Sequence, residues 1–377
     1  MKTSFNDIAT KGVQGLTPYQ PGKPVEELER ELGISGSIKL ASNENPLGPS
    51  ARVQQELTQH LNSLHLYPDG GGFKLRDKLA QFHGVSSSAI TLGNGSNDVL
   101  ELIARAFLTD KDSAVYSEYA FAVYPLVVQA IGAKANIAKA YSADHDSMPF
   151  GHDLEAIFNA IDETTKVVFI ANPNNPTGTW LDVNQLHQFL TKVDEKIIVV
   201  LDEAYFEYMP DDLKPSSINW LVDFPNLIIT RTFSKIHALA GLRVGYAVSN
   251  DSVADLLNRV RQPFNVNTLA QEAACIALDD EEHIKQSIEL NNAGLAQLKH
   301  AFDEMSLESM PTIGNFITVD VKHEGLTIYN VLLKQGVIVR PVGNYGLPHH
   351  LRITVGSQQE NERVIAALKK VLDEASQ

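Results

Sequence analysis

The sequence predicts an α/β protein: a large domain with a mostly parallel sheet sandwiched by helices, followed by a smaller α+β domain. Short runs that are apolar on both faces recur from position 90, with helical stretches between most of them. This pattern is typical of a parallel sheet covered on both sides. The expected strands are 90–92, 114–116, 166–171, 197–201, 227–230 and 244–248, with helices at 97–108, 121–131 and 183–190.

The length of 377 residues favours two domains and an extension over a single core. We expect residues 1–40 to form an N-terminal arm, because residues 15–24 are dense in proline and glycine. An arm with little core of its own usually packs on something else, here a partner subunit. The large domain should span 41–265 and the small domain 266–377. The small domain should contain strands at 315–320, 337–341 and 350–355 and helices at 268–305 and 361–375.

Composition and charge exclude several classes of protein. Hydrophobic residues make up 44% of the chain and charged residues 20%, an ordinary globular composition. The net charge of −15 argues against nucleic-acid binding, which needs a basic surface. The single cysteine, Cys275, allows no internal disulfide and fits a reducing cytoplasm. Because the chain also shows no 18-residue apolar run and no signal-like start, we expect a cytoplasmic protein without a membrane segment.

A lysine that follows an apolar run gives the first chemical signal. Lys235 ends the motif Thr232-Phe233-Ser234-Lys235, and Arg243 lies eight residues later. Burial lowers the pKa of a lysine amine, and a neutral amine can form a Schiff base with an aldehyde. Ser234 and Arg243 would supply donors for a phosphate. Pyridoxal phosphate presents both groups, although an isolated Ser-Lys pair would ordinarily be an exposed loop.

Three further polar segments follow predicted strands, where ligands of parallel α/β sheets bind. Ser96 and Asn97 open a helix after a glycine-rich turn, and their N–H groups can hold a phosphate or simply cap the helix. Asn175 lies beside two prolines and is either a rigid donor to a cofactor or part of a structural turn. Asp202, with Tyr205 three residues on, needs a cation such as a protonated pyridine nitrogen, or else caps a helix.

Along nearly its whole length, the chain resembles the fold-type-I pyridoxal-phosphate-dependent aminotransferases. The general motifs are Asn174-Asn175-Pro176-Thr177-Gly178, Asp202-Glu203-Ala204-Tyr205 and Thr232-Phe233-Ser234-Lys235 with Arg243. Within that superfamily it is most similar to the histidinol-phosphate aminotransferases. The narrower resemblance rests on Leu16-Thr17-Pro18-Tyr19, Ser42-Asn43-Glu44-Asn45-Pro46-Leu47-Gly48-Pro49, Leu66-Tyr67-Pro68-Asp69, Val339-Arg340 and Leu351-Arg352-Ile353-Thr354-Val355-Gly356.

The resemblance implies a role for each matching residue. Lys235 would hold pyridoxal phosphate and move the substrate proton, and Asp202 would pair with the ring nitrogen. The ring oxygen would be bonded by Asn175 and Tyr205, with Asn175 also facing the substrate. The remaining cofactor contacts would come from Thr232, Ser234, Arg243, the backbone at Ser96 and Asn97, the stacked ring of Tyr119, and Tyr67 of a second subunit. The substrate anions would be held by Arg352, Arg340 and Tyr19.

The implied reaction moves the amino group of histidinol phosphate to 2-oxoglutarate, yielding imidazole acetol phosphate and glutamate in histidine biosynthesis. Histidinol phosphate carries a phosphate, whereas glutamate carries two carboxylates, and both must bind in the same site. Two arginines that accept either kind of anion suit such a site. An aromatic amino-acid aminotransferase and a phosphothreonine decarboxylase of the same fold are the alternatives. A pyridoxal-phosphate-binding sensor module is the non-enzymatic one. No metal is expected, because His237, His349 and His350 lack partner ligands at metal-binding spacing.

Overall fold

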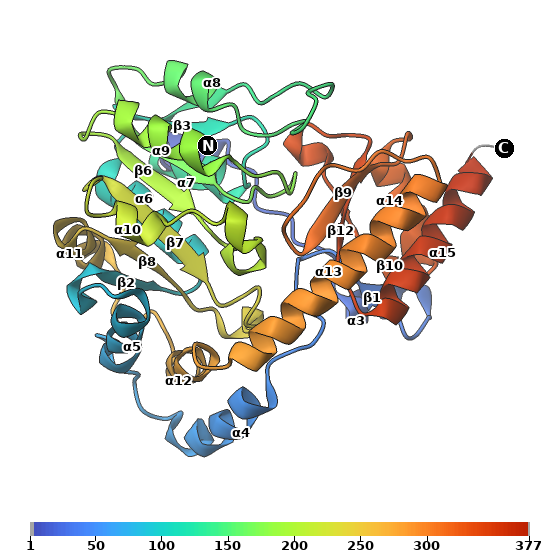
Figure 1. The fold of residues 1–377 in the computed structure, drawn as a ribbon, viewed down its shortest axis with the longest axis horizontal. Coiled ribbons are helices and arrows are strands. Elements are labelled where there is room, and N and C mark those ends of the chain that lie inside the picture. The colour runs from blue at the N-terminus through green and yellow to red at the C-terminus, as the bar shows by residue number, and fades with distance from the viewer. Residues whose placement is uncertain (1–3, 376–377) are drawn as a thin grey trace.

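The structure is a computed structural model that describes residues 4–375. A seven-stranded sheet with helices on both faces forms its larger part, and the C-terminal region forms a smaller α+β part beside it (Figure 1). The sheet order is β2-β8-β7-β6-β5-β3-β4; β8 runs antiparallel to β2 and β7, and the other neighbouring pairs are parallel. The strands are β2 (Ile90–Gly93), β3 (Ser113–Ser117), β4 (Lys134–Ala138), β5 (Thr165–Ala171), β6 (Ile198–Asp202), β7 (Leu227–Thr232) and β8 (Gly245–Ser249).

The mostly parallel sheet and each predicted strand of the large domain are confirmed, and β4 is an addition that the sequence did not reveal. β4 lies at the edge of the sheet, paired only with β3. Most of its side chains are exposed or half-buried, and it carries Lys134 and Asn136. An edge strand need not be apolar on both faces, so it escapes a search for apolar runs.

Alternate residues of the central strands build two separate cores, because successive side chains of a strand point to opposite faces. On one face Val167, Phe169 and Val200 pack against α6, α7 and α11. On the other face Val168 and Ile170 pack against α8, α9 and α10. These helices are α6 (Ser96–Phe107), α7 (Val123–Ile131), α8 (Leu154–Asn159), α9 (Val183–Lys192), α10 (Ser217–Trp220) and α11 (Asp251–Val260).

The smaller part is built on an antiparallel sheet of order β11-β12-β9. The predicted helical region 268–305 consists of two helices, because the Asp280 side chain caps a new one by accepting a hydrogen bond from His283 N. The first packs with α4 and α5 on the large sheet, and the second reaches the small-domain core. The elements are α4 (Ala51–His60), α5 (Phe73–His83), α12 (Thr268–Ala277), α13 (Glu281–Glu304), β9 (Phe316–Asp320), α14 (Gly325–Lys334), β10 (Val337–Ile338), β11 (Arg340–Pro341), β12 (His350–Thr354) and α15 (Gln358–Ala375).

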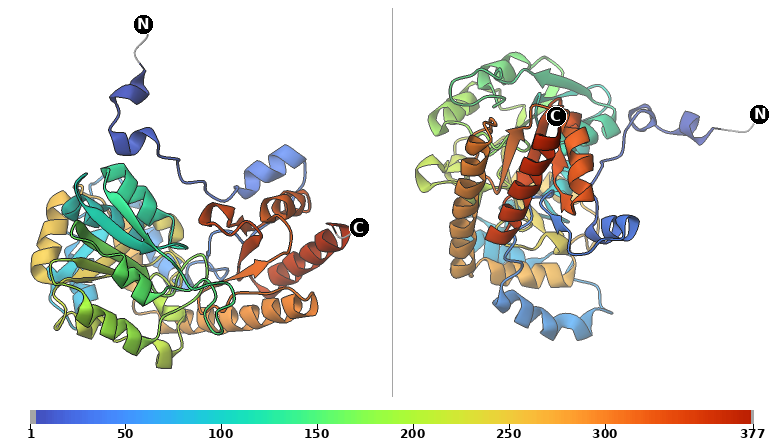
Figure 2. Two further views of the ribbon diagram at one scale, coloured as in Figure 1. Left: turned by 90° about the horizontal axis from the view of Figure 1, so that it is seen from above. Right: turned by 90° about the vertical axis from the view of Figure 1, so that its right-hand side faces the viewer.

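The N-terminal region divides between two positions. α2 (Lys11–Gln14) packs against α7, with Gly12 close to the backbone of Gln129, and α1 (Phe5–Ile8) extends beyond it, away from the body of the molecule (Figure 2). In contrast, α3 (Val25–Leu32) and β1 (Ile38–Lys39) join the small domain, where β1 pairs in parallel with β10. The stretch from α3 to β1 therefore packs as part of the small domain. The domain limits at 40 and 265 stay predictions.

The carboxyl ends of β5, β6 and β7 lie side by side at one edge of the large sheet. Ala171 pairs with Asp202, and Asp202 pairs with Thr230, two residues before β7 ends. Gly245 of the antiparallel β8 lies opposite Thr232 at the same edge. The parallel arrangement thus brings together segments that are separated by about thirty residues each along the chain.

Candidate active site

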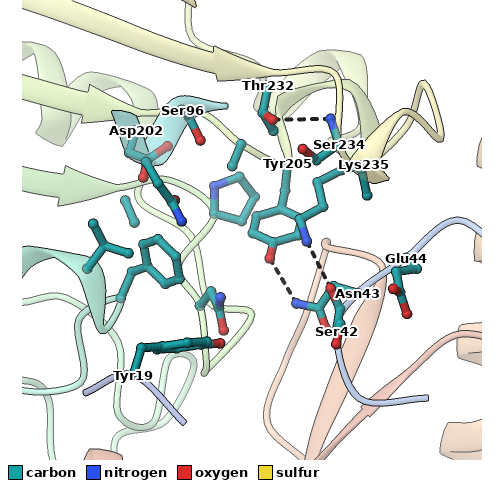
Figure 3. A pocket seen from close by; sticks show the side chains of 18 of the residues that line it. Tyr19, Ser42, Asn43, Glu44, Ser96, Asp202, Tyr205, Thr232, Ser234 and Lys235 are labelled. Carbon is teal, nitrogen blue, oxygen red and sulfur yellow. Dashed lines mark hydrogen bonds between the residues drawn. The ribbon is translucent and has the colours of Figure 1, made fainter. Parts of the chain in front are cut away.

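A cavity of about 380 Å³ lies at this edge of the sheet, between the large domain, the small domain and the chain after β1 (Figure 3). Most of the predicted site residues line it: Tyr19, Ser96, Asn97, Asn175, Asp202, Tyr205, Thr232, Ser234, Lys235, Arg243 and Arg352. Three predicted residues, Tyr67, Tyr119 and Arg340, are not in its lining. The wall also includes Ser42, Asn43, Glu44 and Phe121, to which no role had been given.

The amine of Lys235 lies within the cavity and donates a hydrogen bond to the Ser42 carbonyl oxygen at 3.0 Å (Figure 3). Its pKa falls to about 7, mainly because burial removes hydration from the charged form. The Arg352 and Arg243 guanidiniums lower it as well, and Glu44 acts in the opposite direction. A substantial fraction of this amine is therefore neutral and nucleophilic near pH 7.

Asp202 lies at the end of β6 and is almost fully buried. Its carboxylate accepts hydrogen bonds from the Tyr124 hydroxyl at 2.8 Å and from Thr230 Oγ1 at 3.1 Å. Burial raises the pKa of Asp202, and these two donors oppose the rise. Within residues 4–375 the carboxylate forms no salt bridge, so a cation entering the cavity would relieve a real electrostatic cost.

A cradle suited to a phosphate lies where α6 begins. Arg243 Nη1 approaches Ser234 Oγ at 3.4 Å, and the first residues of α6 line the cavity beside them. Gly95 has a φ of +82°, and a Cβ there would meet Arg243 Nη2 at 2.4 Å; a Cβ on Gly245 would meet Ser96 N at 2.4 Å. The two glycines therefore keep the guanidinium and the helix N–H groups close together, as an anion requires.

Thr232 and Asn175 orient their neighbours in the cavity. The Thr232 hydroxyl oxygen accepts a hydrogen bond from Ser234 N at 3.1 Å, which fixes the turn that leads to Lys235. Asn175 Oδ1 accepts a hydrogen bond from Arg352 Nη1 at 2.5 Å. Because its amide nitrogen remains a donor, Asn175 can serve a cofactor oxygen while it holds the arginine in place.

Two arginines lie side by side across the antiparallel strands β11 and β12. Arg340 and Arg352 are directly paired residues, and both are buried. Their guanidiniums donate only to neutral oxygens, namely those of Gln20, Ala41 and Asn175, and neither forms a salt bridge within residues 4–375. Arg352 Nε has no partner at all. Like charges facing each other are unfavourable unless an anion lies between them.

Arg340 and Tyr19 form an extension of the cavity. The Arg340 guanidinium lies 5.6 Å from the centre of the Tyr19 ring. Tyr19 lines both the main cavity and an adjoining one, of about 630 Å³, whose wall includes Arg340. Arg340 therefore lies behind Tyr19, in the wall of the adjoining cavity, and its predicted part in holding a substrate anion stays a prediction.

The Tyr119 ring does not line the cavity, whereas Phe121 does, and the predicted stacking of Tyr119 on the cofactor stays a prediction. The Tyr119 ring packs edge-on against Phe150 at 5.4 Å, within an apolar cluster beside the small domain. Its backbone carbonyl accepts a hydrogen bond from Asn174, which directs the chain so that the ring two residues later faces inward.

Tyr67 lies at the surface rather than in the cavity. It is 83% exposed and stacks on Phe264 with ring centres 4.9 Å apart. The chain's own fold therefore does not bring it to the cofactor site, and its predicted contribution from a second subunit stays a prediction.

Sequence reasoning missed two residues that shape the site from behind. Tyr124 is fully buried, stacks on Phe169 and donates to Asp202. Asn43 Nδ2 donates to the Tyr205 hydroxyl at 2.8 Å. The signal for Tyr124 was a polar aromatic residue inside an otherwise apolar helix, since a buried hydroxyl needs a partner. Nothing in the sequence indicated which partner either residue would find.

The residues present fit pyridoxal phosphate. One cavity is lined by a carboxylate that has no salt-bridge partner among residues 4–375, by an anion cradle, by aromatic rings and by an amine whose pKa is lowered to about 7. The described residues contain no group of three metal-ligating side chains that could hold a metal ion. No described helix is both long and apolar enough to cross a membrane.

Gly95→Ala should weaken pyridoxal phosphate binding by roughly 10- to 100-fold, because the new methyl group displaces the Arg243 guanidinium from the cradle. Gly84→Ala is the matched control: Gly84 also has a positive φ, +67°, but open space around its Cβ position. Titration of both cofactor-free proteins, followed by visible absorbance, measures the difference. Equal affinities of the two variants would contradict the cradle.

Covalent capture of pyridoxal phosphate by the cofactor-free protein should slow about tenfold per pH unit below about pH 7, because the Lys235 amine gains its proton there. Stopped-flow measurement of the visible absorbance checks this, with N-acetyl-lysine as the reference for an ordinary amine. Lys235→Ala should show no such absorbance. Capture by the protein that follows the pH profile of the reference amine would disprove the depressed pKa.

Comparison with known proteins agrees with this geometry. A family model described as aminotransferase class I and II matches residues 35–368. Histidinol-phosphate aminotransferase 1 of Nitrosococcus oceani is 52% identical over 370 residues, covering 98% of each chain. Histidinol-phosphate aminotransferase 2 of Pseudomonas aeruginosa is also 52% identical, over 372 residues, covering 98% of this chain and 99% of the relative.

Solved structures show the same fold. Histidinol-phosphate aminotransferase from Sinorhizobium meliloti, in complex with pyridoxal-5'-phosphate, has a TM-score of 0.88 at 27% identity, covering 97% of this chain and 98% of its own. L-threonine-O-3-phosphate decarboxylase from Porphyromonas gingivalis has a TM-score of 0.76 at 23% identity, covering 89% and 99%, and shares the fold alone. On its sequence match and its architecture, the chain belongs to the class I and II aminotransferase family.

Proposed function

We propose that the protein transfers the amino group of histidinol phosphate to 2-oxoglutarate, with pyridoxal phosphate as cofactor, as a step of histidine biosynthesis. The observation that carries the proposal is the buried pair Arg340 and Arg352, side by side and without carboxylate partners. A substrate phosphate and the carboxylates of glutamate could each occupy the space between them. The curated relatives that share about half of the sequence are histidinol-phosphate aminotransferases by name.

The chain's own residues divide the work of such a reaction. Bound pyridoxal phosphate supplies an electron-accepting ring that stabilises negative charge on the substrate carbon. Asp202 would hold the ring nitrogen in its protonated form, since Tyr124 and Thr230 fix the carboxylate. Lys235 Nζ would take up the proton of the substrate carbon that bears the amino group, and later return it. The two arginines orient the substrate by an anionic group distant from that carbon.

The cofactor phosphate would lie in the cradle of Ser234, Arg243 and the first N–H groups of α6. The Phe121 ring would limit the position of the flat ring from one side of the cavity. Tyr205 and Asn175 would bond the ring oxygen. These roles place the cofactor anion and the substrate anion at separate sets of arginines, so the two phosphates do not compete.

A substrate panel with 2-oxoglutarate as acceptor tests the proposal. Histidinol phosphate should give a higher kcat/KM than phenylalanine or tyrosine, which carry no phosphate for the arginine pair. It should also exceed phosphothreonine, whose α-carboxylate adds a second anion next to the amino group. Arg340→Ala should lower kcat/KM for histidinol phosphate by roughly 10- to 100-fold and leave phenylalanine turnover nearly unchanged. Arg259→Ala, at an exposed ion pair on α11, is the control.

The same panel separates the alternatives. Release of CO₂ from phosphothreonine without amino transfer would replace the proposal with a decarboxylase. Faster turnover of tyrosine or phenylalanine than of histidinol phosphate would replace it with an aromatic amino-acid aminotransferase. Absence of turnover on every member of the panel, with pyridoxal phosphate firmly bound, would favour a sensor module.

We further propose that the protein is a cytoplasmic homodimer with shared active sites. Tyr67 and Phe73 are 83% and 75% exposed, and Leu66 between α4 and α5 is exposed as well, so this stretch presents apolar side chains to a partner. The segment that holds α1 and α2 offers a second surface for contact (Figure 2). The single buried cysteine is consistent with a reducing compartment.

Mixing two defective variants tests the shared site. Lys235→Ala and Tyr67→Ala proteins should each bind pyridoxal phosphate poorly, whereas a refolded mixture should recover roughly a quarter of the intact sites. Half of randomly formed dimers are hybrids, and each hybrid pairs a native Lys235 with the other subunit's native Tyr67. Cofactor-derived absorbance measures the recovery, with Lys235→Ala plus Val222→Ala, an exposed position, as the control pair. A mixture no better than the separate variants would disprove sharing.

A further inference from the structure

The side chain of Asn43 connects the N-terminal segment to the ring of Tyr205 at the cavity wall. Its Nδ2 donates to the Tyr205 hydroxyl oxygen at 2.8 Å (Figure 3). Asn43 is 1% exposed and has a φ of +56°, a conformation that asparagine tolerates better than most residues. A buried residue in a rarely populated backbone conformation is held there by its surroundings.

The orientation of the Asn43 amide follows from its other bonds. Thr354 Oγ1 accepts the Asn43 backbone N–H at 2.9 Å, so the Thr354 hydroxyl proton is free to be donated to Asn43 Oδ1 at 3.2 Å. With the oxygen of the amide bound to Thr354, its nitrogen must face Tyr205. An amide nitrogen can only donate, so it occupies a lone pair of the phenol oxygen and cannot receive the hydroxyl hydrogen.

We propose that Asn43 is a positioning residue that directs the hydroxyl hydrogen of Tyr205 into the cavity. This inference rests on the proposed function, in which the Tyr205 hydroxyl donates to the ring oxygen of pyridoxal phosphate. A hydroxyl has one hydrogen, and the ring oxygen receives it only if no nearer acceptor does. Donation to the ring oxygen withdraws electron density from it and weakens its hold on the proton of the adjoining Lys235–cofactor linkage.

The neighbours of Asn43 keep it at this position from both sides. Ala41 O accepts from Arg352 Nη2 at 2.6 Å, and Ser42 O accepts from Lys235 Nζ at 3.0 Å. Asn315 Nδ2 donates to the Asn43 carbonyl at 3.0 Å. Three consecutive residues thus contact the substrate arginine, the lysine and the tyrosine, so a small displacement of this segment would alter all three contacts.

Asn43→Asp reverses the donor and keeps the shape. A carboxylate oxygen in place of Nδ2 accepts the Tyr205 hydroxyl hydrogen and turns it away from the cavity, while the bond to Thr354 is retained. The pH midpoint for protonation of the Lys235–cofactor linkage, read from visible absorbance, should rise by about one unit, the size expected for the loss of one hydrogen bond to a charged oxygen. Asn43→Gly, which keeps the backbone conformation but has no acceptor, should give a smaller rise.

Two controls separate positioning from loss of structure. Asn315→Ala loosens the same segment by removing a hydrogen bond to the Asn43 carbonyl, but it leaves the Asn43 side-chain amide and its bond to Thr354 in place, so its midpoint should stay near that of the native protein. Tyr205→Phe should raise the midpoint about as far as Asn43→Asp, and the double variant should rise no further. Thermal unfolding of all variants shows whether stability changes separately from the midpoint.

The outcomes are distinct. A native protein that forms no visible linkage with pyridoxal phosphate would disprove the proposed function itself. With a normal native titration, an unchanged midpoint in Asn43→Asp would overturn the positioning role. So would a further rise when Asn43→Asp is added to Tyr205→Phe, or an equal rise in Asn315→Ala.

Discussion

Charges that the chain buries but leaves unpaired are the constraint on which the site depends. Among residues 4–375, no cation forms a salt bridge with Asp202 and no anion with Arg340 or Arg352, although all three are buried. Removing a charge from water without a partner is expensive, so a fold keeps such groups only where something else completes them. A flat cationic ring with an anionic substrate would satisfy both ends of the cavity together. Burial lowers the pKa of Lys235, and the Arg352 and Arg243 guanidiniums lower it further, so Arg352 serves both binding and reactivity.

The main chain at residues 40–43 links the small domain to the reactive groups of the cavity. Leu40 N donates to Ile338 O at 2.7 Å, and Thr354 N donates to Leu40 O at 2.9 Å, so the stretch belongs to the small domain. The next three residues then contact Arg352, Lys235 and Tyr205 in succession. Any movement of the small domain relative to the sheet would therefore act directly on the reactive groups. The segment 41–43 is better described as part of the site than as a linker.

The buried ion pair between Glu203 and Arg231 contrasts with Asp202, because its two charges neutralise each other within the protein. Glu203, the neighbour of Asp202, accepts two hydrogen bonds from Arg231, and that guanidinium also covers the Phe206 ring at 3.7 Å. Burial raises the pKa of Glu203, and the nearby Arg231 opposes the rise. Adjacent carboxylates on β6 and the turn after it thus have opposite uses. One is neutralised within the protein, and the other is left for a ligand.

The sequence by itself determined the layered α/β fold and which residue types would gather at the strand ends. Runs that are apolar on both faces, with helical stretches between them, leave little choice, because both faces of a parallel sheet must be covered. The tertiary structure alone decided the break at Asp280, the edge strand β4, the presence of Phe121 rather than Tyr119 in the cavity wall, and the partners Tyr124 and Asn43. Local sequence patterns indicate which residues are buried. The hydrogen bond between Asn43 and Tyr205 instead depends on how segments far apart in the sequence pack together, and a local pattern cannot predict that packing.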